Sequence, residues 1–340
     1  MKLMKTEEAV GQILCRDITQ IIPGVTKDAV FRKGHVIAPE DVPVLLSVGK
    51  DNVYIWENNE NMLHENDAAQ ILYDMCADEH VHPSAIKEGK IELIADNDGL
   101  LKIDWQKLLA VNSLGEMMIV SRHGDFPVKK GDKIAGMRVI PLVIEKEKMA
   151  RAQAVAAGGP IFRILPFRHK KVGIVTTGNE VFYGRIQDAF TPVIVEKVQA
   201  FGAEVIGHEI SNDDHERITG CIRRLLDVGA ELILCTGGMS VDPDDRTPLA
   251  IRNSGARIVS YGSPVLPGAM FLVSYWGEKN IPILGVPGCA MYSKRTVLDL
   301  VLPHAFADDV LEKTDLDRLG EGGLCLNCKE CIFPHCGFGK

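Results

Sequence analysis

The chain has 340 residues, of which 46% are hydrophobic and 25% are charged, and its formal net charge at pH 7 is -8. This length allows two or three domains, each with a core of its own. The negative charge, without a dense run of Lys or Arg, argues against a protein that binds nucleic acid. No apolar run is long enough to span a membrane, and the first residues lack the apolar segment of a signal peptide, so we expect a cytoplasmic protein.

The first half of the chain mixes helical and strand patterns. Residues 30–57 predict a strand, a helix and a second strand, and residues 64–80 predict a helix with its apolar residues on one face. The Asp-Gly pair within residues 90–103 is typical of a β-hairpin. Residues 117–144 are rich in strand formers, and residues 146–159 predict a helix that ends in two glycines. We therefore expect a separate, β-rich α+β domain in this half.

Strands and helices alternate in the second half. The predicted strands are residues 170–178, 203–210, 230–238 and 281–288, and the predicted helices are residues 191–202, 215–229 and 247–255. Thr191 and Pro192 are expected to begin the first of these helices. Such alternation predicts the α/β class, with a doubly wound, mostly parallel sheet. The expected domains are residues 1–160 for the N-terminal module, residues 161–312 for the α/β domain and residues 313–340 for a Cys-rich tail.

Three of the predicted strands end in glycine turns. These turns are Val175–Glu180, Cys235–Ser240 and Leu284–Cys289, and the first two also carry Thr or Ser hydroxyls. In a parallel sheet, ligands bind beyond the carboxyl ends of the strands. Backbone amides of such turns bind phosphate, and glycine lets the phosphate approach the backbone closely. A single glycine turn is more often only a tight turn, but three turns at one sheet edge favour a phosphate site.

Acidic side chains occupy the same predicted edge. They are Glu180, Asp188, Asp213, Asp214, Asp242, Asp244 and Asp245. Some have simple structural explanations, because Asp213 or Asp214 can cap the next helix and residues 242–245 can form an exposed turn. The alternative is a Mg²⁺ ion between carboxylates and phosphate, since Mg²⁺ takes oxygen ligands from both. That arrangement is typical of phosphoryl or nucleotidyl transfer.

Five segments in this order, over residues 170–307, resemble the molybdopterin-binding domain of molybdenum-cofactor biosynthesis proteins: TTGNE, SNDDHERI, TGGMSVDPDDRTP, YGSPVLPGAMF and ILGVPGCAMYSKRT. That domain occurs in the molybdopterin adenylyltransferase and in the molybdate-inserting transferase. The resemblance implies a doubly wound fold that binds molybdopterin, usually in a homo-oligomer. It also implies Mg²⁺-dependent chemistry on molybdopterin or its adenylylated form, with ATP or molybdate as further substrates.

The resemblance also assigns roles to individual residues. Asp245, Asp213 and Glu180 match the family's functional acids and are expected to be catalytic and to hold Mg²⁺. The residues expected to bind the cofactor are Thr177, Gly178, Thr236, Gly237, Gly238, Ser240, Pro287 and Gly288.

The sequence departs from the family pattern in three places. Asn179 stands where the inserting enzymes have Asp, Ala269 where they often have Lys, and Cys289 where they have Asn or Gln. In those enzymes, a segment like residues 34–57 directly precedes the domain, whereas here residues 58–170 separate the two. The reaction therefore stays open between adenylylation and molybdate insertion. The alternative is a non-catalytic carrier that delivers the cofactor to a molybdoenzyme, and a third option keeps the fold but binds another nucleotide.

Four cysteines lie close together near the C-terminus. Cys325, Cys328, Cys331 and Cys336 follow the spacing C-x2-C-x2-C-x4-C. In a cytoplasmic protein this spacing indicates a metal site rather than disulfides. Zn²⁺ takes four such thiolates, and an iron–sulfur cluster with four cysteines has a similar spacing. The alternative is an unstructured tail with reactive thiols.

Overall fold

The computed structural model describes residues 2–22, 26–55 and 60–340. The chain divides into two units. The first comprises Met1–Asn97, Ile103–Arg122 and Lys130–Arg163, and the second comprises Asp98–Lys102, His123–Lys129 and Ile164–Lys340. These limits differ from the expected domains, because two short segments of the first half and the whole Cys-rich tail belong to the second unit. Within the described residues, no helix is long and apolar enough to cross a membrane.

The N-terminal part of the first unit has a small core of its own. Its elements are β1 (Lys2–Lys5), η1 (Thr6–Glu8), β2 (Ile18–Ile22), β3 (Thr26–Phe31), α1 (Asp41–Ser47) and β4 (Asn52–Ile55). β2 pairs with β3 and β1 with β4, both antiparallel. Leu14, Ile37 and Leu45 are buried between them. The predicted strand–helix–strand order is confirmed by β3, α1 and β4, although the last predicted residues, Trp56 and Glu57, lie outside the described residues.

The remainder of the first unit is an antiparallel sheet with helices. The sheet has the order β6-β7-β11-β9, and β5 pairs separately with β12. The elements are β5 (Met62–His64), α2 (Glu65–Cys76), β6 (Val81–Pro83), β7 (Lys90–Ala95), α3 (Trp105–Asn112), β9 (Met117–Ser121), β11 (Lys133–Val139), β12 (Val143–Glu145) and α4 (Lys146–Val155). α2 and α4 confirm the helices predicted for residues 64–80 and 146–159, and the β-rich α+β character of the first half is also confirmed.

The hairpin predicted for residues 90–103 is wrong. β7 pairs with β6 and β11, whereas β8 (Gly99–Ile103) belongs to a three-stranded sheet with β10 (Phe126–Val128) and β13 (Phe162–Pro166). Leu100 and Leu101 of β8 are fully buried, and a Cβ on Gly99 would lie 2.5 Å from the carbonyl oxygen of Leu165. Gly99 therefore permits a close approach of β8 to β13 instead of a tight turn back to β7.

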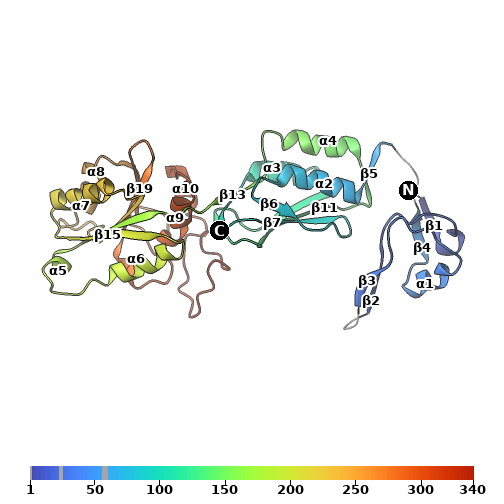
Figure 1. Ribbon diagram of the computed structural model, residues 1–340, viewed down its shortest axis with the longest axis horizontal. Helices are drawn as coiled ribbons and strands as arrows, with labels where there is room; N and C mark the ends of the chain where they lie inside the picture. The colour runs from blue at the N-terminus through green and yellow to red at the C-terminus, as the bar shows by residue number, and fades with distance from the viewer. Residues whose placement is uncertain (1, 23–25, 56–59) are drawn as a thin grey trace. The chain divides into compact units, whose positions relative to one another are not determined.

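The second unit is built on a six-stranded sheet with the order β15-β14-β16-β19-β18-β17 (Figure 1). β15, β14, β16 and β19 are parallel, and β18 and β17 add two antiparallel strands at one edge. The sheet strands are β14 (Lys171–Thr177), β15 (Glu204–Ser211), β16 (Leu232–Thr236), β17 (Arg257–Tyr261), β18 (Leu272–Trp276) and β19 (Ile281–Val286). The helical elements are α5 (Asn179–Phe182), α6 (Phe190–Gln199), α7 (His215–Asp227), α8 (Thr247–Asn253), η2 (Gly288–Met291), α9 (Val297–Phe306) and α10 (Lys313–Arg318). The predicted α/β class is therefore confirmed.

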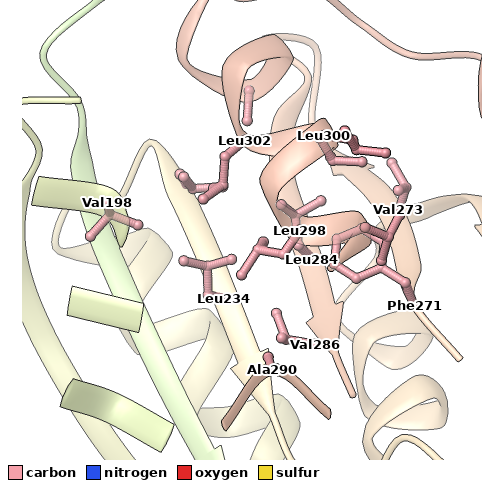
Figure 2. Close-up of a cluster of buried hydrophobic side chains, with 14 of the residues drawn as sticks. Val198, Leu234, Phe271, Val273, Leu284, Val286, Ala290, Leu298, Leu300 and Leu302 are labelled. Atoms are coloured by element: carbon pink, nitrogen blue, oxygen red, sulfur yellow. The ribbon is translucent and has the colours of Figure 1, made fainter. Parts of the chain in front are cut away.

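Alternate residues of the central strands face two different cores, as expected for a doubly wound sheet. On one face, Ile174 and Leu234 pack against α6 and α9, and Figure 2 shows Leu298 of α9 within this cluster. On the other face, Val175 and Ile233 pack against α7 and α8, which lie side by side in Figure 1. Burial on both faces explains why these strands are continuous apolar runs.

The start of α6 differs from the prediction. The helix begins at Phe190 with Ala189 as its N-cap, and Oδ1 of Asp188, one residue earlier, accepts hydrogen bonds from the amides of Phe190 at 2.8 Å and Thr191 at 3.0 Å. The hydroxyl of Thr191 donates to the same carboxylate. Asp188, one of the acids at this sheet edge, therefore has a structural role.

Candidate functional site

The carboxyl ends of β14 and β16 open onto a cavity of about 140 Å³, which we call the glycine–acid cavity. Seven of the expected site residues line it. They are Thr177, Gly178, Glu180, Asp213, Gly237, Gly238 and Asp245. The structure thus brings together the three acids and the first two glycine turns, as the strand order requires, because the carboxyl ends of neighbouring parallel strands meet at one edge.

The two glycine turns touch each other directly. Gly237 has φ +85°, and a Cβ at this position would lie 2.3 Å from the carbonyl oxygen of Thr177. A Cβ on Gly238, with φ +56°, would lie 2.6 Å from Oγ1 of Thr247. Thr177 joins the turns as well, because its hydroxyl donates to the carbonyl of Thr236 at 3.2 Å and lies 3.1 Å from Oγ1 of Thr247. Only glycine fits at both positions.

The acids of this edge separate into structural and cavity-lining groups. The side chain of Asp214 caps α7, since it accepts from the amides of Glu216 at 2.8 Å and Arg217 at 3.1 Å. Its neighbour Asp213 lines the cavity and accepts from the amide of Asn179 at 2.9 Å. The choice between these two adjacent acids is therefore resolved, and Asp213 is the one that faces the cavity.

Asp245 is held in a similar way. Its Oδ2 accepts from the amide of Ser240 at 2.7 Å, and its own amide donates to the carbonyl of Asp242 at 2.9 Å. Residues 242–245 do form a turn in which Asp242 and Asp244 are exposed, but Asp245 is only partly exposed and lines the cavity. The turn thus positions the carboxylate of Asp245, one of the three that line the cavity.

The cavity concentrates negative charge. Burial raises the pKa of Asp213, the hydrogen bond from Asn179 opposes this increase, and the carboxylates of Glu180 and Asp245 raise the pKa further. Asp213 is therefore close enough to two other acids to be repelled by both. A cation between them would relieve this repulsion.

The three acids of the glycine–acid cavity do not form a closed metal site in the described part of the chain. Among residues 2–22, 26–55 and 60–340, the one group with three ligand atoms within 4.8 Å of one another is Asp125, His304 and Asp309, none of which lines this cavity. In that group, Lys102 already neutralises the two carboxylates, at 2.5 Å from Asp125 and 2.9 Å from Asp309.

Four of the residues expected to bind the cofactor do not line this cavity. Thr236 is buried in β16, Ser240 is exposed, Pro287 is buried, and Gly288 is exposed at the start of η2. They were expected from the resemblance of the loops to the family, which does not reveal the direction of a side chain.

Several apolar residues that line the cavity were missed by the sequence argument. They are Val181, Ile186, Ala189, Phe190 and Met291, and Gln187 lies with them. All but Met291 belong to the segment between β14 and the first turn of α6. No motif in the sequence marks them, but their position directly after the first glycine turn was a usable signal.

The Cys-rich tail is ordered and forms a second cavity. Cys325, Cys328, Cys331 and Cys336 all line a space of about 640 Å³, which we call the cysteine cavity. The tail is attached to the domain by two backbone hydrogen bonds of 2.8 Å, from Cys325 to Leu266 and from Leu266 to Gly323. The alternative of an unstructured tail is therefore wrong.

Two parts of the chain match known families. Residues 173–306 match the model described as "Probable molybdopterin binding domain". Residues 3–57 match a "Domain of unknown function (DUF8806)". The N-terminal segment is thus recognised separately from the α/β domain.

Individual relatives cover only parts of the chain. A molybdopterin molybdenumtransferase from Synechococcus elongatus is 27% identical over 162 residues, which is 45% of this chain and 38% of that protein. A CinA-like protein from Mycobacterium avium is 39% identical over 77 residues, 23% of this chain and 18% of that protein. The chain thus spans less than two fifths of the length of either relative.

Among solved structures, the molybdopterin biosynthesis enzyme MoaB from Thermus thermophilus is similar, with 27% identity and a TM-score of 0.33. The match covers 40% of this chain and 91% of MoaB. The matched family model spans β14 to α9, the same elements that build the glycine–acid cavity. Residues 173–306 are therefore similar to the probable molybdopterin-binding domain, and part of the chain is similar to the molybdopterin molybdenumtransferase relative.

Proposed function

We propose that this protein acts in molybdenum-cofactor biosynthesis and binds molybdopterin, or its adenylylated form, in the glycine–acid cavity. The observation that supports this most directly is the convergence of two glycine turns and three acids on one cavity at the sheet edge. The family of residues 173–306 supplies the ligand class. The proposed reaction is Mg²⁺-dependent nucleotidyl transfer or molybdate insertion.

The glycine turns would hold the phosphate end of the ligand. Gly178, Gly237 and Gly238 line the cavity without side chains, so a phosphate oxygen can reach the backbone amides there. Ile186, Phe190 and Met291 add apolar surface to the same cavity, which suits the flat pterin ring. We therefore assign the phosphate to the turns and the ring to the apolar wall.

The three acids would share one Mg²⁺ with the phosphate groups. Asp213 and Asp245 each use one carboxylate oxygen for a backbone amide, at 2.9 Å and 2.7 Å, which fixes their orientation. Glu180 completes the set from the first turn of α5. When bound, Mg²⁺ would offset the negative charge of carboxylates and phosphates. In this proposal the glycine turns position the phosphate of the ligand, and the three carboxylates determine where the metal ion binds.

The reaction can be tested with purified protein, molybdopterin, ATP and Mg²⁺. In adenylylation, a phosphate oxygen of molybdopterin bonds to the α-phosphorus of ATP, and pyrophosphate leaves. A second reaction contains adenylylated molybdopterin and molybdate. We expect pyrophosphate and adenylylated product in the first reaction, or release of AMP in the second. Binding of molybdopterin without product in either reaction would instead support the non-catalytic carrier, and binding of a nucleotide without any pterin would support the third option.

Asp245→Asn tests the role of the acids. The substitution removes a charge but keeps an oxygen that can accept from Ser240, so we expect turnover to be lost while molybdopterin still binds. Asp242→Asn is the matched control, because Asp242 is exposed in the same turn and does not line the cavity. Full turnover by Asp245→Asn would contradict the assignment, and so would equal losses in both variants.

The remaining expectations from the resemblance stay predictions. These are the homo-oligomer, the molybdoenzyme partner and a cytoplasmic location. Zn²⁺ or an iron–sulfur cluster at the tail cysteines is also a proposal.

A further inference from the structure

The tail forms a closed loop around the cysteine cavity. At its base the amide of Gly339 donates to the carbonyl of Gly322 at 2.9 Å, and Phe338 is buried in the core of the second unit. Cys325 and Cys336 pack against the same core, whereas Cys328 and Cys331 are exposed on the loop between them. Four thiols from one short segment therefore surround one cavity of about 640 Å³.

The spacing of the thiols is too wide for a single ion. Tetrahedral Zn²⁺ with Zn–S bonds of about 2.3 Å places its sulfur ligands about 3.8 Å from one another. No three of the four sulfur atoms, all within the described residues 60–340, lie within 4.8 Å of one another. In a [4Fe–4S] cluster each cysteine binds a different corner iron, so the sulfur ligands are about 6 Å apart and enclose the cluster. A cavity between separated thiols fits the second geometry.

The surroundings of the cavity match the charge and polarity of such a cluster. A [4Fe–4S]²⁺ cluster with four thiolates carries a net charge of about -2. Lys294 and Arg295 line the cavity, and Arg295 contacts Cys331. The Nε of Arg295 is buried and has no hydrogen-bond partner in the described part of the chain, so it can donate to a sulfur atom. Leu326 and Ile332 also line the cavity and add apolar surface to it.

We propose that Cys325, Cys328, Cys331 and Cys336 bind one [4Fe–4S] cluster in the cysteine cavity. Each thiol loses its proton to solvent and bonds to one iron, while two ferrous ions, two ferric ions and four sulfide ions supply the 2+ core without any further oxidant. This inference does not depend on the proposed function of the glycine–acid cavity, because it rests on different residues.

The test is anaerobic reconstitution of the full-length protein. One sample receives equal amounts of ferrous and ferric iron with sulfide, a second receives Zn²⁺ alone, and a third receives all of these together. We expect about four iron atoms and about four sulfides per chain in the first and third samples. We also expect a broad visible absorption that fades when dithionite reduces the cluster, together with an electron paramagnetic resonance signal in the reduced protein.

Cys328→Ser and Cys331→Ser test the ligands. Both side chains are exposed, so the variants should fold, and circular dichroism checks this. We expect both to lose most of the bound iron. Cys289→Ser is the matched control, since Cys289 is partly buried in the same unit but does not line the cysteine cavity, and it should keep its iron.

Three results would overturn the cluster. The first is one Zn²⁺ per chain and no iron in the mixed sample. The second is no bound metal in any sample, which would leave the cavity as an apolar groove for another molecule. The third is full iron content in the folded Cys328→Ser and Cys331→Ser variants.

Discussion

Replacing Gly237 by alanine tests how closely the two glycine turns meet. The new Cβ would lie 2.3 Å from the carbonyl oxygen of Thr177, a backbone atom at the end of β14 that cannot rotate away. The left-handed backbone at φ +85° costs an alanine about 1–2 kcal/mol. Forcing β14 and β16 apart adds about 1–3 kcal/mol, as overpacking does elsewhere. We therefore expect Gly237→Ala to lower the free energy of unfolding by about 2–5 kcal/mol.

The assay is urea denaturation, followed by circular dichroism, of Gly237→Ala beside Gly288→Ala. Gly288 lies at the same sheet edge, but it is exposed, and its nearest neighbour to a new Cβ is Phe190 at 4.0 Å. The control should stay within about 0.5 kcal/mol of the parent protein. If Gly237→Ala unfolds at the same urea concentration as this control, the two turns are not in contact and the shape of the cavity is wrong.

Two further predictions concern the stability of the second unit. Burial opposes ionisation of Asp309, but hydrogen bonds from His304 and Lys102 outweigh it and lower the pKa to about 2 from 3.8. The ionised form thus stabilises the fold at neutral pH, and this contribution disappears as the pH falls from about 4 to about 2. Asp309→Asn should therefore lower the free energy of unfolding in urea by about 2 kcal/mol at pH 7 and by clearly less at pH 3. An equal loss at both pH values would contradict the ion pair. Leu298→Ala should cost about 2–5 kcal/mol in the same assay, because Leu298 is fully buried in the cluster of Figure 2. Leu249 on α8 is 42% exposed, so Leu249→Ala should cost far less. Similar losses for both variants would show that α9 does not pack as described.

Local signals account for the elements that could be predicted from the sequence. α7 has a capping Asp214, apolar residues at helical spacing and Gly229 after its end, so every signal lies within the helix or next to it. The meeting of the glycine turns was also predictable, because it follows from parallel strand order. By contrast, the partners of β8 are β10 and β13, which lie far along the chain, and the Asp-Gly pair before β8 carries no information about them.

The direction of individual side chains could not be predicted. Asp213 and Asp214 are adjacent acids with the same chemistry, and only the backbone at the end of β15 decides which one caps α7 and which one lines the cavity. Likewise, C-x2-C-x2-C-x4-C spacing is compatible with zinc and with an iron–sulfur cluster. The choice depends on how the closed loop places the sulfur atoms, which no local sequence signal reveals.

Consecutive residues line the glycine–acid cavity and the cysteine cavity. Met291 borders the glycine–acid cavity, and Tyr292 borders the cysteine cavity. If occupation of one cavity shifts this short stretch of backbone, the wall of the other must move with it. Thermodynamic reciprocity then requires that each occupant change the affinity for the other by the same factor, so titrating either one with and without the other would measure a single coupling free energy.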